Sequence, residues 1–539
     1  TNTIMKTNLY PQHSSARKTL RRAVALMALM LTTALAINAQ GPRRQVIHPR
    51  RCKHSTNPTL IQTPTTTSSK GMRKAMPMDT STPDGLGQYG VSAKGTVASI
   101  GEPNIPVIMV EFKDLKFNSE TTADKVTRMM NENGYNDEPE CVGSVRDYFI
   151  DNSDGLFSPK FTVVDKVTVQ QKCEYYGGNN SSGDDKNVRA LVEEAVERAQ
   201  IDNIDFTPFL VDGKVPMVII YYAGLGEHNC FDDDAAKYIW AHFSNYSFTS
   251  EGIKFGSYFA GNEWRKDYAL DEHGSMITTG EHIDGIGVLI HELMHALGMP
   301  DFYPTNGALY ETPDYWSIMD YGNYYGDGNR PVGLTAYEKS YLGWLDIHHL
   351  DTAQAVTLKP GQAAVIYNSD TEKEYYVLEN RQPATWYPTN YGHGMLVMHV
   401  DFDKTIWGKN TPNNIENHLR MKVLCANGEW IGVMQDDFSF ERLRTNLYAF
   451  NTEPSEITTT STPASNPYNA GTIEPVYDIR QEGDDIIFSF IKKDISTAID
   501  GAQADTQADG TIYTIDGRRV NQPATPGLYI KNGKKLIMK

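Results

Sequence analysis

Residues 283–301 read IDGIGVLIHELMHALGMPD and carry the most specific chemical pattern in the chain. The apolar residues predict a helix, on which His291 and His295 lie about one turn apart on the same face. Two imidazoles at this spacing can bind one metal ion, and Glu292 between them can accept a proton from a metal-bound water. The pattern H-E-x-x-H therefore predicts a zinc site suited to amide hydrolysis.

The third metal ligand is expected just after this helix. Gly298 can adopt the left-handed conformation that ends a helix, and Pro300 cannot continue one, so Asp301 can turn back toward the metal. A rival arrangement takes its third ligand about twenty residues after the motif, where Glu311 and Asp314 lie. We favour Asp301, because it matches the shorter spacing together with the glycine, whereas Asp314 lies in a loop-like stretch.

The combined pattern H-E-x-x-H-x-x-G-x-x-D, followed by SIMDY at residues 317–321, resembles the metzincin zinc peptidases, which place a methionine turn beneath the metal. The resemblance implies that Met319 is this methionine, with ordinary core filling as the alternative. It also implies that Tyr321 binds the resting zinc or donates a hydrogen bond to the tetrahedral oxyanion. A chain with Asp301 as third ligand need not use that phenol.

Aspartate in place of the commoner third histidine, within G-I-G-x-x-x-H-E-x-x-H-x-x-G-x-P-D-F-Y, is similar to the immune inhibitor A family of secreted bacterial peptidases. Other stretches share the resemblance, namely SVRDYF at 144–149, IIYYAGLGE at 219–227, IWAH at 239–242, YYVLENRQ at 375–382 and GHGMLVMHVD at 392–401. The resemblance covers about residues 95–492. It implies one catalytic Zn²⁺, protein or peptide substrates, and a metzincin-like domain built from a twisted sheet and helices.

The beginning of the sequence predicts export. Lys18, Arg21 and Arg22 precede an apolar run over residues 23–36, which is typical of a signal peptide, here residues 1–39. The run is too short for a good membrane span and no other long apolar segment occurs, so we expect a secreted or cell-surface protein without stable membrane insertion.

The composition of residues 40–94, rich in Arg, Lys, Thr, Ser and Pro, predicts a loosely ordered pro-segment. The resemblance to secreted zinc peptidases implies that this segment keeps a zymogen latent. Cys52 is a candidate thiolate ligand that blocks the zinc, and a free or disulfide-bonded thiol is the alternative.

The acidic net charge of −17, with no block of Lys and Arg after Arg51, gives no electrostatic basis for binding nucleic acid. Five cysteines are too few and too scattered for a disulfide scaffold, and their odd number leaves at least one unpaired. One or two bridges remain open. A chain of 539 residues is expected to form several domains.

The expected fold class is α+β, with a catalytic domain over residues 95–345. Its apolar strands are predicted at 106–112, 161–169 and 215–222, with a supporting helix at 185–199 and a closing helix at 335–342. In residues 346–492, short apolar segments alternate with turn residues, which predicts an all-β sandwich domain. Its strands are predicted at 356–358, 363–367, 375–380, 395–400, 421–425 and 486–491, and a long loop at 453–471.

Three further patterns leave alternatives open. His393 and His399 could form a second metal site, but we interpret them as structural or surface histidines. Residues 224–228 form either a cleft-lining loop or a solvated glycine turn. Residues 232–234 are three aspartates that either bind Ca²⁺ or cap a helix and face water.

Residues 493–539 are predicted to be a linker followed by a small C-terminal β segment. Asp-Gly at 516–517 and Asn-Gly at 532–533 favour tight turns between short strands. The segment resembles the C-terminal sorting segments of proteins exported by the type IX secretion machinery, which would then be a partner. The alternative is a small β module without a sorting role.

The sequence as a whole predicts a secreted zinc metalloendopeptidase in which Glu292 is the general base. The alternative from another class is an exported binding or adhesion protein with a zinc-stabilised, peptidase-like fold. Glu292 argues against it, because a purely structural zinc site needs no general base and closes its fourth position. A small-molecule zinc hydrolase is a third interpretation.

Overall fold

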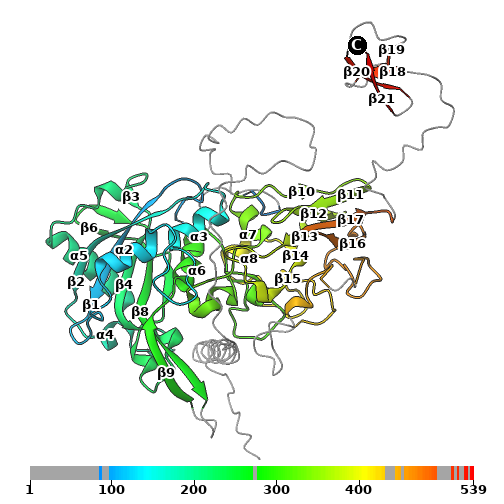
Figure 1. The fold of residues 1–539 in the computed structure, drawn as a ribbon. Helices are drawn as coiled ribbons and strands as arrows, with labels where there is room; N and C mark the ends of the chain where they lie inside the picture. Colours follow the sequence, from blue (N-terminus) through cyan, green and yellow to red (C-terminus); the bar gives the residue numbers. More distant parts are fainter. Residues whose placement is uncertain are drawn as a thin grey trace, which may run out of the picture.

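The computed structural model describes residues 84–87, 96–181, 183–270, 276–430, 443–450, 454–493, 512–514, 519–520, 527–531 and 534–538 (Figure 1). The predicted signal peptide, most of the predicted pro-segment and Cys52 lie outside these residues and stay predictions. Within the described ranges, every helix is too short or too polar to cross a lipid bilayer. Helices and sheets both contribute to the structure, in agreement with the expected α+β class.

The first part of the chain is built on a six-stranded sheet with the order β2-β1-β4-β8-β5, in which β9 also pairs with β8. Its strands are β1 (Asn104–Glu111), β2 (Lys160–Thr168), β4 (Val218–Leu225), β5 (His242–Ser244), β8 (Tyr258–Leu270) and β9 (Met276–Ile283). Strands β2, β1, β4 and β8 are parallel, and β5 and β9 are antiparallel to β8. The first two predicted strands are confirmed as β1 and β2, and the third divides into β3 (Lys214–Val215) and β4.

Helices cover both faces of this sheet, because successive residues of a buried strand point to opposite sides. Ile108 of β1 belongs to one apolar cluster with Leu191 of α5 (Val188–Ile201), the helix predicted at 185–199. Its neighbour Met109 belongs to a second cluster with Leu293 of the motif helix, α6 (Gly287–Ala296). Helices α2 (Ala123–Asn131) and α3 (Val145–Asn152) contribute to the second cluster, so α6 lies on the face opposite α5.

The remaining elements of this part are short. A three-stranded sheet has the order β3-β7-β6, with β6 at Phe248–Ser250 and β7 at Ile253–Phe255. The helices are α4 (Cys173–Gly177) and α7 (Ala336–Tyr341), the latter confirming the predicted closing helix. Thr335 and Glu338 form a capping box that starts α7.

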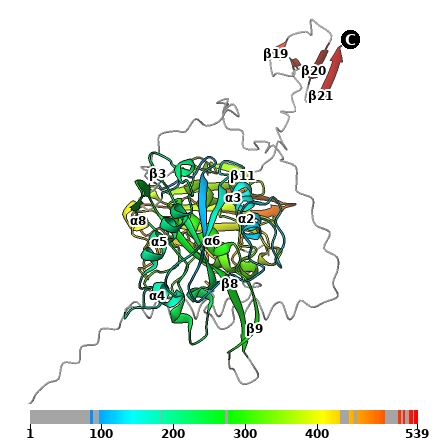
Figure 2. The ribbon, with the colours of Figure 1, turned by 90° about the vertical axis from the view of Figure 1, so that its left-hand side faces the viewer.

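The hairpin of β8 and β9 was not predicted. Both strands extend beyond the other strands of the sheet and project from the body of the molecule (Figures 1 and 2).

The second part of the chain forms two sheets. The larger has the order β10-β12-β13-β14-β15, with β10 at His348–His349, β12 at Ala363–Asn368, β13 at Thr371–Arg381, β14 at Gly394–Asp401 and β15 at Met421–Val423. The smaller has the order β11-β17-β16, with β11 at Gln354–Leu358, β16 at Val476–Glu482 and β17 at Asp485–Phe490. All six strands predicted for this part are confirmed, and β10 and β16 were missed.

The larger sheet is buried on both faces. Tyr376 and Leu378 of β13 share an apolar cluster with Phe488 of the smaller sheet. Tyr375 and Val377, which point the other way, belong to the cluster that contains α6. The two parts of the chain lie side by side and share this core (Figure 1). The sandwich domain over residues 346–492 therefore stays a proposal, because one face of its larger sheet is packed on the preceding part of the chain.

The end of the predicted pro-segment also packs on this body. Leu86 belongs to the shared core, and the backbone N–H of Gly87 donates to the carbonyl of Ser340 at 2.7 Å. The hydroxyls of Tyr367 and Tyr375 donate to the side chain and the carbonyl of Asp84, each at 2.6 Å. A truncated chain that keeps residue 84 onward retains these contacts.

The C-terminal residues form a four-stranded sheet with the order β19-β18-β20-β21. Its strands are β18 (Ile512–Thr514), β19 (Arg519–Val520), β20 (Gly527–Lys531) and β21 (Lys534–Met538). The strand pairs flank the two predicted turns, and the sorting role of this segment stays a prediction.

Candidate metal centre

Helix α6 begins where two glycines pass close to a neighbouring backbone. A Cβ atom on Gly285 would lie 2.2 Å from the carbonyl carbon of Gly328, and one on Gly287 would lie 1.9 Å from the carbonyl oxygen of Asn323. No side chain fits at either position. After the helix, Gly298 has φ of 102°, the positive value expected for the residue that ends it.

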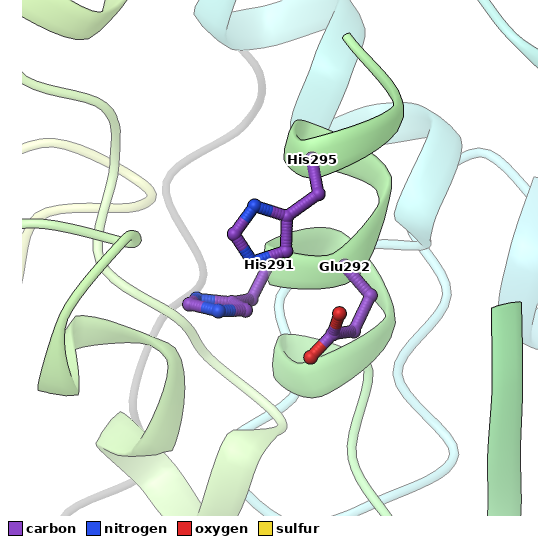
Figure 3. A group of neighbouring side chains, drawn as sticks. All are labelled: His291, Glu292 and His295. Carbon is purple, nitrogen blue, oxygen red and sulfur yellow. The ribbon is translucent and has the colours of Figure 1, made fainter. Parts of the chain in front are cut away.

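The two histidines of α6 face one another (Figure 3). Their ring centroids are 4.9 Å apart, and the ligand atoms of His291, Glu292 and His295 all lie within 4.8 Å of one another. Asp301 joins them, because its Oδ1 lies 3.2 Å from Nε2 of His291 and 3.1 Å from Nε2 of His295. Glu311, the rival ligand, instead contacts Lys422 at 3.1 Å.

The hydrogen bonds of the two rings prepare them for a metal. Nδ1 of His291 lies 2.7 Å from the carbonyl oxygen of Ile318, and Nδ1 of His295 lies 2.7 Å from that of Met299. A carbonyl can only accept, so both Nδ1 atoms carry a proton, and both Nε2 atoms point at Asp301, where a bound metal would replace a proton on Nε2. Two imidazole nitrogens and one carboxylate oxygen that converge in this way suit zinc.

Electrostatics keeps this aspartate ionised. Burial alone would raise the pKa of Asp301, but His295 and His291 hold it well below its usual range. Burial likewise opposes charge on His291, yet the carboxylates of Asp301 and Glu292 raise its pKa to about 9. Negative charge is therefore concentrated where a cation would bind.

Glu292 is held in place by the neighbouring edge strand. Its Oε2 accepts a hydrogen bond of 2.7 Å from the backbone N–H of Phe243 in β5. The carboxylate therefore lies between the histidines and the edge of the sheet.

The predicted methionine turn lies beside the ligands. The carbonyl of Ile318 is the partner of His291, and the carbonyl of Met319 accepts from the N–H of Phe302, the residue after Asp301. Met319 is fully buried in the shared core. Ser317 fixes the turn, because its hydroxyl bonds Glu338 and accepts from the N–H of Met319.

A cleft opens onto this centre. Its lining residues include His291, Glu292, Tyr303, Tyr321 and His228. The predicted site residue Tyr321 thus lines the same cleft as His291 and Glu292. His228 lies in the short 3-10 helix Glu227–Asn229, just after β4. Of the two alternatives for residues 224–228, its place in the lining supports the cleft.

His228 was not predicted as a site residue. It is 2 % exposed, and neither ring nitrogen has a hydrogen-bond partner among the described residues. Its Nε2 lies 3.8 Å from Oδ2 of Asp284, which accepts from the side chains of Asn229 and Asn262. Burial lowers the pKa of His228, so this imidazole is neutral and can donate from one nitrogen. Its position after a Gly-rich strand end was the only signal in the sequence.

The other candidate sites have ordinary partners. Asp232 pairs with Lys266 and Asp234 with Lys237, both at 2.6 Å, and calcium binding there stays a prediction. His399 bonds the buried Glu374 at 2.9 Å.

His393 lies 2.8 Å from the side-chain oxygen of Gln481. The four cysteines within the described residues, Cys141, Cys173, Cys230 and Cys425, are free thiols.

The helix, the converging ligands and the carboxylate beside an open cleft define a metallopeptidase of the H-E-x-x-H class. Residues 94–345 match the family model of the immune inhibitor A peptidase M6 catalytic domain. This region of the chain, which carries the metal centre, therefore belongs to the immune inhibitor A-like family of metallopeptidases.

Curated relatives agree with this assignment. The chain is 28 % identical over 224 residues to the pre-pro-metalloprotease PrtV of Vibrio cholerae, a match that covers 37 % of this chain and 23 % of the relative. It is 25 % identical over 304 residues to immune inhibitor A of Bacillus thuringiensis, covering 47 % of this chain and 42 % of the relative. The chain thus spans less than half the length of the relatives it matches.

Proposed function

We propose that the chain is a secreted zinc-dependent endopeptidase that hydrolyses peptide bonds of extracellular proteins. The observation that carries this proposal is the position of Glu292, whose carboxylate lines an open cleft beside three converging ligand atoms. A site that only stabilised the fold would need neither the cleft nor the base.

His291, His295 and Asp301 would hold the zinc, which when bound lowers the pKa of a water molecule and polarises the scissile carbonyl. Glu292 accepts the proton of the attacking water and passes it to the nitrogen of the leaving amine. The N–H of Phe243 holds one oxygen of Glu292, which fixes the rotation of the carboxylate between these two transfers.

The edge strand β5 offers a place where a peptide substrate would pair. It ends the six-stranded sheet, and its N–H at Phe243 points to Glu292. An extended peptide that pairs with this edge would bring its scissile bond to the base. This arrangement favours a polypeptide over a small molecule.

Two residues of the cleft are proposed to donate hydrogen bonds to the oxyanion that forms during hydrolysis. The Tyr321 phenol stays protonated, because burial raises its pKa well above the usual value. His228 offers a ring nitrogen without another partner in the described structure. Tyr321→Phe and His228→Gln, each compared with the unmodified chain, would apportion the role, and loss of one such donor typically lowers kcat about 10²–10³-fold.

The proposal is tested with the chain from residue 84 onward, which keeps the packed residues 84–87. Cleavage of a labelled unfolded protein and zinc content are measured for this chain, for Glu292→Gln and for Glu197→Gln. Glu197 is exposed on α5, on the opposite face of the sheet, and serves as the matched control.

The expected result is about one zinc in all three proteins, full cleavage by the control, and a loss of about 10²–10⁴-fold in Glu292→Gln. Zinc without cleavage in the unmodified chain would favour the exported binding or adhesion protein. Absence of zinc from the unmodified chain would contradict the metal centre itself.

A further inference from the structure

We propose that Asn410 is a positioning residue that aims the Asp301 carboxylate at the metal; this inference rests on the proposed function. Nδ2 of Asn410 donates to Oδ2 of Asp301 at 2.5 Å. Oδ1 of the same amide accepts from the backbone N–H of Asp301 at 2.6 Å. One side chain thus binds both the backbone and the carboxylate of the third ligand.

These two hydrogen bonds decide which carboxylate oxygen faces the histidines. The terminal torsion of an aspartate is soft, so the carboxylate of Asp301 needs an external partner to fix it. Asn410 occupies Oδ2, and Oδ1 is left at 3.2 Å and 3.1 Å from the Nε2 atoms of His291 and His295. The histidines need no such help, because their helix and two backbone carbonyls already orient them.

The backbone around Asn410 is fixed in turn. It follows α8 (Lys404–Gly408), and its N–H donates to the carbonyl of Trp407 at 3.0 Å. Its φ of 61° lies in the left-handed region, which asparagine and glycine tolerate better than other residues. Its carbonyl accepts from the Thr305 hydroxyl at 2.9 Å, so backbone and side chain both bind the loop that contains Asp301.

Two further asparagines bind the same loop without touching the ligand. Nδ2 of Asn413 donates to the carbonyl of Phe302 at 2.8 Å, and Oδ1 of Asn414 accepts from the N–H of Thr305 at 2.8 Å. We call Asn410, Asn413 and Asn414 the asparagine clamp. The clamp lies beyond residue 345, where the match to the family model ends. The metal centre is therefore completed by the second part of the chain.

The clamp supplies its own control. Asn410→Gly removes the amide and keeps a residue that accepts positive φ. Asn410→Asp keeps the shape but places a carboxylate oxygen against Oδ2 of Asp301, where two negative charges repel. Asn414→Ala loosens the same loop and leaves both hydrogen bonds to Asp301 intact.

All variants are made in the chain from residue 84 onward. Zinc affinity is measured by competition with a chelator, the melting temperature is measured without metal, and the visible absorption spectrum is recorded with Co²⁺ in place of zinc. We expect Asn410→Gly to weaken zinc binding about 10–100-fold. Asn410→Asp should weaken it more, and both should alter the Co²⁺ spectrum. Asn414→Ala should lower the melting temperature and leave zinc affinity and spectrum unchanged.

The inference fails if Asn410→Gly binds zinc as tightly as the unmodified chain, or if Asn414→Ala weakens zinc binding equally. Either result leaves the proposed peptidase function standing, since the unmodified chain still binds zinc and cleaves. If the unmodified chain binds no zinc, the proposed function and this inference fall together.

Discussion

Two regions of the chain position the side chains of the metal centre, helix α6 and the residues around Asn410. They differ in how far along the sequence the positioning residues lie from the side chains that they hold. Helix α6 places His291 and His295 on one face through helical spacing, four residues apart. Asn410 reaches Asp301 from 109 residues further along the chain, through two side-chain hydrogen bonds. The identity of the ligands is therefore a local property of the sequence, whereas the geometry of the third ligand depends on long-range packing.

The same contrast holds for the core beneath the site. Trp386 packs edge-on against Tyr148 at 5.0 Å and donates to Asp151 at 2.8 Å. Trp407 donates to the hydroxyl of Tyr337 at 3.0 Å. Both tryptophans come from the second part of the chain and close the apolar cluster around α6. The region matched by the family model is therefore not a self-contained core.

The largest expected effect follows from removing the second region altogether. Residues 94–345 expressed alone would expose the faces of Tyr148 and Tyr337 that the tryptophans now cover, so we expect no cooperative thermal transition and no fixed aromatic signal in the near-ultraviolet circular dichroism spectrum. The chain from residue 84 onward is the reference. A cooperative melt and unchanged zinc affinity in the fragment would show that the two regions are independent.

A single residue at the junction should show a smaller loss. Arg381 of β13 donates to the carbonyls of Leu334 at 3.0 Å and Gly333 at 3.2 Å, and to Glu379 at 3.0 Å, and it is buried. Arg381→Met leaves the buried Glu379 without its cation, although its Oε2 still accepts from the N–H of Ala336, and removes a donor from two carbonyls. The free energy of unfolding in urea should therefore fall by about 3–5 kcal/mol.

The control for this prediction is an exposed arginine. Arg480 pairs with Glu482 at 2.8 Å on the surface, and Arg480→Met should change the free energy of unfolding by less than about 1 kcal/mol. Equal losses of unfolding free energy in the two variants would show that Arg381 does not stabilise the contact between the two parts of the chain.

Acidic pH should lower the stability of the second part of the chain, because the carboxylate of Glu374 becomes protonated. Burial alone would raise the pKa of Glu374, but hydrogen bonds from His399 and from the N–H groups of Tyr468 and Asn469 lower it to about 2. A depressed pKa stabilises the fold above the unfolded value of about 4.3, and this contribution is lost as the pH falls toward 2.

Urea unfolding of the unmodified chain and of Glu374→Gln at a series of pH values tests this expectation. The difference in unfolding free energy should be on the order of 2–3 kcal/mol larger near neutral pH than near pH 2. A difference that stays constant over this range would mean that the carboxylate titrates alike in the folded and unfolded chain.

The local part of this architecture could be predicted from the sequence. The helical spacing in α6, the helix end at Gly298 and the apolar strands β1 and β2 each follow from neighbouring residues. The hairpin of β8 and β9 was not predicted, because β8 shows no apolar alternation. It carries charged residues close together, namely Glu263, Arg265, Lys266 and Asp267.

The long-range part could not be predicted, because its signals are ambiguous locally. Residues 410–414 read NTPNN, which is typical of a turn and says nothing of Asp301. For His228, the sequence shows only that this residue follows a glycine-rich strand end. The shared core was missed for a similar reason, since a strand buried on both faces is uniformly apolar and does not reveal what covers each side.

The smallest effect concerns the local signal itself. Gly298 has φ of 102° and lies between α6 and Asp301, so Gly298→Ala should cost about 1–2 kcal/mol of stability. Gly361 has φ of 76° with open space around it, and Gly361→Ala should carry a similar strain far from the metal. Melting and zinc titration of both variants separate strain from site geometry. Only Gly298→Ala should weaken zinc binding, and by less than Asn410→Gly, because Asn410 still holds the carboxylate of Asp301. A larger loss of zinc affinity in Gly298→Ala would mean that the helix end, and not Asn410, determines the position of Asp301.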